Sequence, residues 1–321
     1  MKKLKKLCMI ALIVILALGT ISAGCAEEEK YLIGFSTRTL TNEPFQALVL
    51  ETIEKAVTDA GHEVVTMTTD TGSDAAQQVT QLEDMINMGC DAIIYVPIDG
   101  TSSIEVLRTC SDKNIPVVLI DGVLEDGYED LYVTLIATDN YQAGYALGEY
   151  AASIGITEGQ IICCRGPEGN VACDNRVNGF IDAMTSLTEV TVAAERYTEG
   201  NNESTMNTVQ QMLAACPEPV AFFCAADVWV EGGVLALEEA GLDDVAVFAV
   251  DGSETGISLL MDGMILADAQ QNPRLMATKS VEIALSILNG ETTADDYEDY
   301  IDSGITLVTM DNAEEAMENA F

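Results

Sequence analysis

The sequence predicts an α/β protein built from two doubly wound parallel-sheet lobes. From Tyr31 onward, short β-rich runs alternate with segments whose apolar residues recur about every 3.6 positions, which is typical of parallel sheets covered by helices. There are ten such runs, more than one small sheet needs. Roughly 290 residues follow the N-terminal segment, enough for two domains of ordinary size. No long low-complexity linker separates them, and we expect the lobes to divide near Thr138.

The expected strands are short runs rich in β-branched and aromatic residues. Helices are expected between most of them. The strands cover residues 31–36, 63–69, 92–96, 117–120, 131–137, 160–164, 190–197, 220–224, 245–250 and 265–269.

The first expected helix, 44–60, begins at Pro44, whose fixed backbone suits a first helical turn, and Gly61 ends it. Its apolar residues share one face. They are Phe45, Leu48, Val49, Ile53, Ala56, Val57 and Ala60. Further helices are expected over 75–88, 141–154, 204–215, 230–240 and 275–288.

The first 24 residues have the order of a secretory signal peptide: lysines, an apolar stretch, then small residues. The apolar stretch is about a dozen residues, shorter than the roughly 20 that a membrane-spanning helix needs. The segment Ser22-Ala23-Gly24-Cys25 resembles a bacterial lipobox, with Ser22 where such sites usually carry leucine. This implies lipidation of Cys25, with 25–30 as anchor and tether; the alternative is ordinary cleavage nearby.

The charge is strongly negative. The chain has 53 acidic and 14 basic residues, a formal net charge of −39, and removal of the four signal lysines leaves 10 basic residues and about 43 net negative charges. Phosphate backbones bind proteins through clustered Lys and Arg. Nucleic acid is therefore not expected as a partner, and neither is an anionic lipid surface.

The cysteines beyond Cys25 show no paired Cys-x-x-Cys spacing, so neither a zinc site nor a disulfide framework is expected. Many stand in apolar runs and are expected to be buried small hydrophobes. They are Cys90, Cys110, Cys163, Cys164, Cys173, Cys216 and Cys224.

Several motifs follow the strands in a characteristic order and spacing. They are Asn42-Glu43-Pro44-Phe45, Asn114-Ile115-Pro116-Val117-Val118-Leu119-Ile120-Asp121, Thr138-Asp139-Asn140 with Gly144, Arg176-Val177-Asn178-Gly179-Phe180, Phe222-Phe223-Cys224-Ala225-Ala226-Asp227, Val250-Asp251-Gly252 and Gln270-Gln271-Asn272-Pro273. With these motifs the chain resembles the periplasmic sugar-binding proteins of the ribose-binding type, over residues 31–308.

The resemblance implies the type I periplasmic-binding-protein fold, in which three crossing strands form a hinge between two Rossmann-like lobes. We expect the crossings near Thr138, Gln271 and Ile301. The N-terminal lobe would comprise 31–137 plus 271–300, and the C-terminal lobe 138–270 plus 301–321. Ligands of parallel sheets bind beyond the carboxyl ends of the strands, so the loops after the strands of both lobes would face one cleft.

Matched residue by residue, the resemblance implies polar ligand contacts from Asp121, Arg176, Asp251 and Gln271. Carboxylates accept hydrogen bonds from adjacent hydroxyls while Arg and Gln donate to oxygens, which suits a polyol. The residues alone leave other interpretations open. Asp121 and Asp251 each precede glycine, as turn residues do, and Arg176 could be a surface residue of a first helical turn.

Two aromatic residues are candidate walls of the site. Phe45 matches a family aromatic that packs on the sugar's apolar face, and it also fits the apolar face of its own helix. Trp229, the only tryptophan, follows the Ala226-Asp227 turn and could stack on the ligand from the opposite lobe.

Departures from the ribose pattern concern the ligand. They remove donors and aromatic walls, which disfavours ribose itself, and Glu43 adds a negative group that favours an amino- or amide-bearing ligand unless Arg38 balances it. The expected order is a neutral sugar or polyol, then amino-sugar or nucleoside-like compounds. Where the family places Asn, Asn, Arg, Phe, Asn and Phe, this chain has Glu43, Val96, Gly122, Gly200, Ala226 and Val250.

The expected function is capture of a small polar ligand by hinge closure and its delivery to an ABC transporter. The chain has no Gly-x-x-x-x-Gly-Lys phosphate loop, which implies that the ATPase belongs to the transporter. We expect a monomer on the outer face of the cell membrane, anchored through Cys25, with no cofactor or metal.

The sequence argues against two other function classes. The sole histidine, His62, lies in a Gly61-His62-Glu63 turn, which argues against His-based catalysis. Sugar-responsive repressors share the fold but begin with a basic helix-turn-helix, whereas this chain begins with an export signal. The alternative that stays open is a sensor that docks to a receptor or kinase ectodomain.

Overall fold

The structure is a computed structural model that describes residues 30–41 and 43–321. The expected signal peptide, 1–24, and the expected lipidation residue Cys25 lie outside these residues. Within the described part of the chain, no helix has both the length and the apolar character needed to cross a membrane. The body from Leu32 to Phe321 contains two six-stranded sheets.

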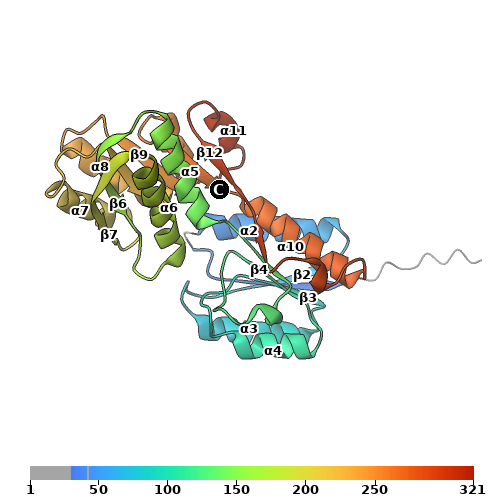
Figure 1. The fold of residues 1–321 in the computed structure, drawn as a ribbon. Coiled ribbons are helices and arrows are strands. Elements are labelled where there is room, and N and C mark those ends of the chain that lie inside the picture. The colour runs from blue at the N-terminus through green and yellow to red at the C-terminus, as the bar shows by residue number, and fades with distance from the viewer. Residues whose placement is uncertain (1–29, 42) are drawn as a thin grey trace, which may run out of the picture. The chain divides into compact units, whose positions relative to one another are not determined.

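The first sheet has the strand order β11-β5-β4-β3-β1-β2, and all its pairs are parallel. Helices α2 (Pro44–Asp59) and α10 (Pro273–Leu288) pack together on one face, while α3 (Ala75–Met88) and α4 (Ile104–Asp112) cover the other (Figure 1). Its strands are β1 (Leu32–Thr37), β2 (Glu63–Thr68), β3 (Ala92–Tyr95), β4 (Val117–Ile120), β5 (Thr134–Ala137) and β11 (Tyr300–Asp302).

The second sheet has the order β12-β10-β9-β8-β6-β7 and is parallel except for β12. Its strands are β6 (Glu158–Cys164), β7 (Glu189–Arg196), β8 (Ala221–Cys224), β9 (Ala246–Asp251), β10 (Ala267–Gln271) and β12 (Ile305–Val308). Its helices are α5 (Asn140–Ser153), α6 (Val171–Leu187), α7 (Asn202–Leu213), α8 (Val230–Glu239), α9 (Glu254–Met261) and α11 (Ala313–Met317).

Helices on both faces explain why several strands read as continuous apolar runs. β4 (Val-Val-Leu-Ile) and β8 (Ala-Phe-Phe-Cys) are buried along their whole length, as expected for parallel strands covered on two sides. On one face of the second sheet, Phe180 of α6 stacks on Phe223 of β8 with ring centroids 4.5 Å apart. The prediction of two doubly wound parallel-sheet lobes is confirmed.

Three segments carry the chain from one sheet to the other, at residues 138–139, 272 and 303–304. The sequence placed the second and third near Gln271 and Ile301. Gln271, however, is the last residue of β10 in the second sheet, and Ile301 pairs with Ile136 in the first. Strand pairing therefore moves both crossings one or two residues later than expected.

Hydrogen bonds join the first and third crossings. Ser303 N donates to Ala137 O at 2.9 Å, and the Thr138 and Ser303 hydroxyls lie 3.3 Å apart. Asp139 N donates to the Asp302 carboxylate at 3.2 Å. The two segments are thus held together, as a shared hinge requires.

The seven cysteines beyond Cys25 are all buried and free. They stand in the hydrophobic cores of both lobes. Cys163 and Cys164, for example, occupy adjacent positions of β6 and face opposite cores of the second sheet. Their burial agrees with the sequence interpretation of cysteine as a small hydrophobe.

Candidate functional site

Four of the residues predicted for the site stand where strands of the two sheets end. Arg38 follows β1 and Asp121 follows β4 in the first sheet, while Asp251 and Gln271 are the last residues of β9 and β10 in the second. Carboxyl ends of parallel strands share one edge of a sheet, where ligands of such sheets bind. Each sheet thus contributes one wall, which we call the first and the second wall.

The first wall is centred on Asp121. Its Oδ2 accepts hydrogen bonds from Gln46 Nε2 at 3.2 Å and Arg38 Nη2 at 3.5 Å. Gln46 is fully buried, and its own Oε1 accepts from the Thr37 hydroxyl at 2.7 Å. Strand β1 and helix α2 therefore hold the Asp121 carboxylate in place.

Glu43 joins this wall through Arg38, whose Nε lies 3.8 Å from Glu43 Oε2. Burial raises the pKa of Glu43, the charge of Arg38 opposes this, and the charges of Asp121 and Asp251 raise it further. Arg38 thus lies between the carboxylates of Glu43 and Asp121 and balances part of their negative charge. The sequence favours an amino-bearing ligand only if Arg38 does not balance Glu43.

The second wall is centred on Arg176, which is only 6% exposed. Its Nη1 donates to Asp251 Oδ1 at 2.8 Å and to Ala225 O at 2.9 Å, and its Nε donates to Asn140 Oδ1 at 2.8 Å. Burial acts to lower the pKa of Arg176, but neighbouring charges, with Asp251 foremost, outweigh burial, and the pKa is raised. Arg176 is a buried, bonded cation and not a surface residue.

Close packing of α5 against α6 brings Asn140 to Arg176. A Cβ at Gly144 would lie 1.8 Å from the Arg176 carbonyl oxygen, and one at Gly179 would lie 2.0 Å from Tyr141 O. Only glycine allows this approach. The sequence marked Gly144 and Gly179 as parts of motifs, and their physical role is to set the distance between these two helices.

Asp251 links Arg176 to the second crossing. Its Oδ1 also accepts a hydrogen bond from Gln271 Nε2 at 2.7 Å. Burial raises the pKa of Asp251, and the charge and hydrogen bonds of Arg176 and Gln271 oppose that rise. Arg176, Asp251 and Gln271, predicted separately from the sequence, are therefore one bonded group.

Positive backbone angles mark both carboxylates. Among the described residues, the non-glycine positions with positive φ are Asn114 (56°), Asp121 (62°) and Asp251 (134°). Asparagine and aspartate tolerate angles near 60° well, as turn residues do, whereas 134° lies outside the left-handed helical region. A sparsely populated conformation costs about 1–3 kcal/mol and clusters at functional sites. Two of the three positions with positive φ are the predicted site carboxylates.

The charges of the two walls act on one another. Asp121 of the first wall raises the pKa of Asp251 and of Arg176 in the second. Such coupling requires that the groups be near each other in a poorly screened environment. The structure thus brings Asp121, Arg176 and Asp251 into one electrostatic neighbourhood.

Phe45 is 9% exposed and packs on the apolar face of α2. Its ring contacts the ring of Phe321, which the sequence interpretation did not single out. The structure therefore gives Phe45 a protein partner, and its contact with a ligand stays a prediction.

Trp229 lies against the loops that follow β6 and β7. A Cβ at Gly166 would be 2.6 Å from its ring, and one at Gly200 would be 3.2 Å from it. Gly200 is a position where the ribose-binding type carries phenylalanine. The indole therefore stands beside the place of a missing aromatic, at the carboxyl edge of the second sheet.

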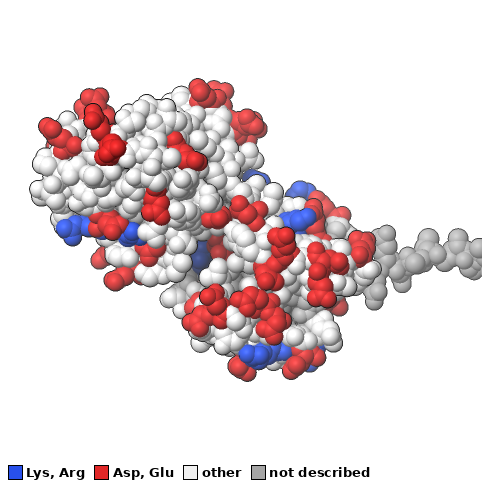
Figure 2. Space-filling model, in the orientation of Figure 1, with Lys and Arg blue, Asp and Glu red and all other residues white. Residues whose placement is uncertain are grey.

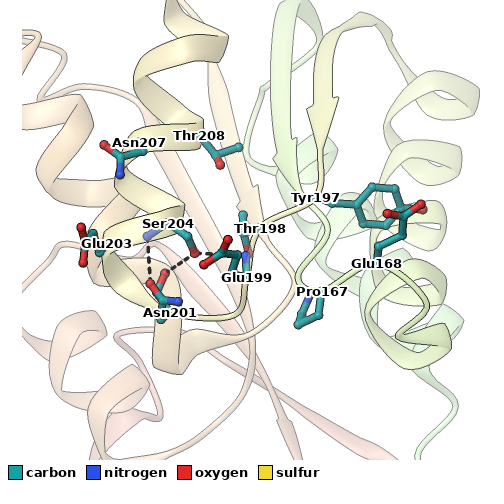
Figure 3. A pocket seen from close by; sticks show the side chains of 10 residues that line it. All are labelled: Pro167, Glu168, Tyr197, Thr198, Glu199, Asn201, Glu203, Ser204, Asn207 and Thr208. Atoms are coloured by element: carbon teal, nitrogen blue, oxygen red, sulfur yellow. Dashed lines mark hydrogen bonds between the residues drawn. The ribbon is translucent and has the colours of Figure 1, made fainter.

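A surface pocket of about 680 Å³ opens between these loops and α7 (Figure 3). Its lining carries Glu168, Glu199 and Glu203 but none of the predicted site residues. Asn201 caps α7 by accepting from Ser204 N at 2.9 Å, and the Ser204 hydroxyl accepts from Glu199 N at 3.1 Å. The pocket belongs to one lobe, whereas the predicted site has two walls.

The sequence interpretation missed several residues that hold the walls. Gln46 and Asn140 position Asp121 and Arg176, and the Ala225 carbonyl accepts from Arg176. A signal existed for Gln46, since a glutamine beside the apolar face of a helix has to find a buried partner. No signal existed for a backbone carbonyl.

The surroundings of the site offer no metal centre: no group of three or more His, Cys, Asp or Glu in the described ranges is arranged to hold a metal ion. Acidic side chains are spread over the face in Figure 2, where basic ones are few. Within the site, Arg38 pairs with Asp121 and Arg176 with Asp251.

Two parallel-sheet lobes with polar residues at the strand ends of both define a two-lobed α/β binding protein. A family model described as a periplasmic binding protein domain matches residues 33–292. The chain belongs to this family, which confirms the resemblance seen in its motifs.

Among known relatives, the ribose import binding protein of Escherichia coli K12 is 27% identical over 288 residues, covering 90% of this chain and 94% of the relative. A solved solute-binding protein of Actinobacillus succinogenes with bound D-allose has a TM-score of 0.80 at 22% identity and covers 89% of this chain and 100% of its own. One from Bacillus halodurans with bound myo-inositol has a TM-score of 0.77 at 23% identity, covering 92% and 99%. At these identities the two structures show the fold.

Proposed function

We propose that this protein captures a neutral sugar or polyol between the two walls and delivers it to an ABC transporter. The observation that carries this proposal is the bonded group of Arg176, Asp251 and Gln271 at the edge of one sheet, coupled electrostatically to Asp121 at the edge of the other. Relatives named for ribose import, D-allose and myo-inositol support the ligand class.

The free acceptors of the site suit hydroxyl groups. Asp121 and Asp251 use only one oxygen each toward described residues, which leaves Oδ1 of Asp121 and Oδ2 of Asp251 for a ligand. A hydroxyl that donates to a carboxylate makes a charge-assisted bond, which is stronger than a neutral one. Trp229 supplies an apolar face of the kind that a sugar ring packs against.

We rank neutral sugars and polyols first, the ligand types named for the relatives, and amino-sugars or nucleoside-like compounds second, because one carboxylate of the site exceeds its arginines. Three carboxylates, those of Glu43, Asp121 and Asp251, stand with two arginines, and both arginines are engaged with them. Ribose is not our first choice, because Glu43 and Gly200 replace a donor and an aromatic of the ribose pattern. We propose a hexose or cyclitol instead, the ligand types of the D-allose-bound and myo-inositol-bound neighbours.

Hinge closure supplies the mechanism. The ligand bonds to one wall, the second wall closes over it, and the transporter distinguishes the closed form from the open one. The chain acts as an extracytoplasmic monomer, exported by 1–24 and anchored through Cys25, and it leaves its ligand chemically unchanged. A receptor or kinase ectodomain in place of the transporter is the alternative partner.

A thermal-shift screen of the purified protein against sugars, polyols, amino-sugars and nucleosides tests the proposal. A ligand at a hundred times its dissociation constant should stabilise the native state by about 2.7 kcal/mol. Asp121→Ala and Arg176→Ala should abolish the response. Arg165→Ala is the matched control, because Arg165 also pairs with carboxylates of the second lobe, Asp174 and Glu195, but belongs to neither wall.

Separate measurements test the remaining parts. Recovery of chemically altered ligand after prolonged incubation would exclude a pure binding function. Cells that express the protein should incorporate labelled fatty acid into the wild type and not into the Cys25→Ala variant. Incorporation that persists in Cys25→Ala would exclude Cys25 as the lipid anchor. Co-purification with a kinase ectodomain, and with no transporter, would favour the sensor.

A further inference from the structure

Two carboxyl groups lie behind the second wall and take no part in the site described above. Asp227, in the short helix η2 (Asp227–Trp229), and Asp268 of β10 are both 0% exposed. A buried ionised carboxylate is costly unless donors or cations surround it. The contacts of each group therefore decide its charge.

Asp227 has donors, and both come from Ser253. Its Oδ2 accepts from Ser253 N at 2.7 Å, and its Oδ1 accepts from the Ser253 hydroxyl at 2.8 Å. Ser253 follows Asp251 by two residues and caps α9. Asp227 thus fixes the segment Asp251-Gly252-Ser253, which carries the strained ligand carboxylate.

Asp268 lacks such donors. Neither of its oxygens has a hydrogen bond of regular geometry with a described residue. The Asp227 carboxyl and the backbone amide of Gly252 both lower its pKa as hydrogen-bond partners, which they do only at short range. Two ionised carboxylates cannot form a hydrogen bond with each other, because both only accept. A hydrogen bond between Asp227 and Asp268 therefore requires that one of them is protonated and donates its O–H to the other.

Among the charged groups around the pair, Asp251 favours that proton and Arg176 opposes it. Asp251 at the end of β9 adds a negative charge and Arg176 of α6 a positive one, while the Cys224 thiol of β8 faces Asp227. Burial, followed by the charge of Asp251, raises the pKa of Asp268 to about 7. Burial and the charge of Asp268 raise the pKa of Asp227 as well.

We propose that Asp227 and Asp268 share one proton and that this acid pair positions the Asp251-Gly252-Ser253 segment, so that ligand capture weakens when the pair loses its proton to solvent. Loss of the proton leaves two facing buried charges. Asp227 then turns from Ser253, or η2 and β10 move apart, and either change displaces Asp251. The effect on capture rests on the proposed function; the shared proton does not.

The pH dependence of ligand affinity tests the positioning role. With the sugar or polyol that gives the largest thermal shift, the wild-type dissociation constant should rise about tenfold between pH 6 and pH 8, because a carboxyl with a pKa of about 7 is about tenfold less protonated at pH 8 than at pH 6. Asp268→Asn, whose amide donates to Asp227 at every pH, should bind with a pH-independent constant. Asp262→Asn, at the exposed end of α9 in the same lobe, should keep the wild-type slope. A flat wild-type profile, or an Asp268→Asn profile with the wild-type slope, would overturn the proposal.

Unfolding without ligand separates this proposal from the proposed function. A carboxyl with a raised pKa binds its proton more tightly in the folded state, so stability falls as pH rises from about 4 to about 7. The urea concentration at the midpoint of unfolding should fall between about pH 4 and about pH 7 in the wild type. The midpoint of Asp268→Asn should fall less over the same pH range. Asp227→Asn, which also keeps a donor in the pair, serves if Asp268→Asn does not fold. Equal slopes in wild type and folded variant would refute the shared proton; a slope difference in a protein that binds no sugar would refute only the proposed function.

Discussion

The ring of Phe321 meets the ring of Phe45 edge-on, with centroids 5.3 Å apart and ring planes at 88°. Phe45 lies in the first turn of α2 in the first lobe. Phe321 follows α11, and its carbonyl oxygen accepts from Glu254 N at the start of α9 in the second lobe at 2.9 Å. This aromatic pair therefore ties the two lobes at the residue that the family resemblance assigns to the ligand.

Removal of this tie tests the two interpretations of Phe45. A ligand that packs on Phe45 has to displace Phe321, and an aromatic pair contributes about 0.5–1.5 kcal/mol. Phe321→Ala should therefore tighten ligand binding by about two- to tenfold in isothermal titration calorimetry, while Met310→Ala, an exposed residue nearby in sequence, changes nothing. Lower stability with unchanged affinity would make Phe45 a core residue only.

Arg176 should not tolerate replacement by lysine. Lysine keeps the charge but loses the planar fork that reaches Asn140, Ala225 O and Asp251 together. Because hydrogen bonds of charged groups contribute about 1.5–3 kcal/mol each, Arg176→Lys should weaken binding at least tenfold. Arg165→Lys, at an ion pair outside the walls, should stay within about twofold; equal losses would mean that Arg176 acts through general stability.

The single tryptophan provides an optical test of the second wall. Gly200 and Gly241 have nearly the same backbone angle, φ 71° and 72°, but only a Cβ at Gly200 meets the Trp229 ring. Alanine at either site should cost about 1–2 kcal/mol of stability for its left-handed conformation. Only Gly200→Ala should shift the emission of Trp229 and weaken ligand binding. Identical emission and affinity in both variants would remove Trp229 from the wall.

The buried thiols should resist alkylation in the folded protein. Burial raises the pKa of Cys90, Cys110 and Cys173 to about 11 and that of Cys224 to about 12, and the thiolate is the reactive form. Iodoacetamide at pH 8 should label the seven body cysteines only after denaturation. Rapid labelling of a native thiol would contradict this burial.

The sequence predicted the fold well because helix and strand periodicities differ and parallel strands are apolar throughout. It missed β11 and β12, since Tyr300–Asp302 and Ile305–Val308 are short and partly exposed and depend on partners far away in sequence. The shifted crossings have the same cause. Strand pairing decides where Gln271 and Ile301 belong, and pairing is not local.

The site was partly predictable. Asp121, Asp251 and Gln271 stand at recognisable strand ends and Arg176 in a helix motif, so the family motifs located them. Their bonding could not be read from the sequence, because it depends on helix spacing set by glycine and on partners such as Gln46. Phe321 and Asp268 belong to no motif of the sequence. Their partners, Phe45 and Asp227, are distant in sequence and become evident only in the packed structure.

The central claim is that one ligand is held by walls from both lobes. Small-angle scattering of the purified protein, with and without the ligand chosen by the thermal-shift screen, tests it most directly. The account predicts a smaller radius of gyration with ligand, and no decrease in Arg176→Ala under the same conditions. An unchanged radius in wild-type protein saturated with a proven ligand would contradict capture by lobe closure.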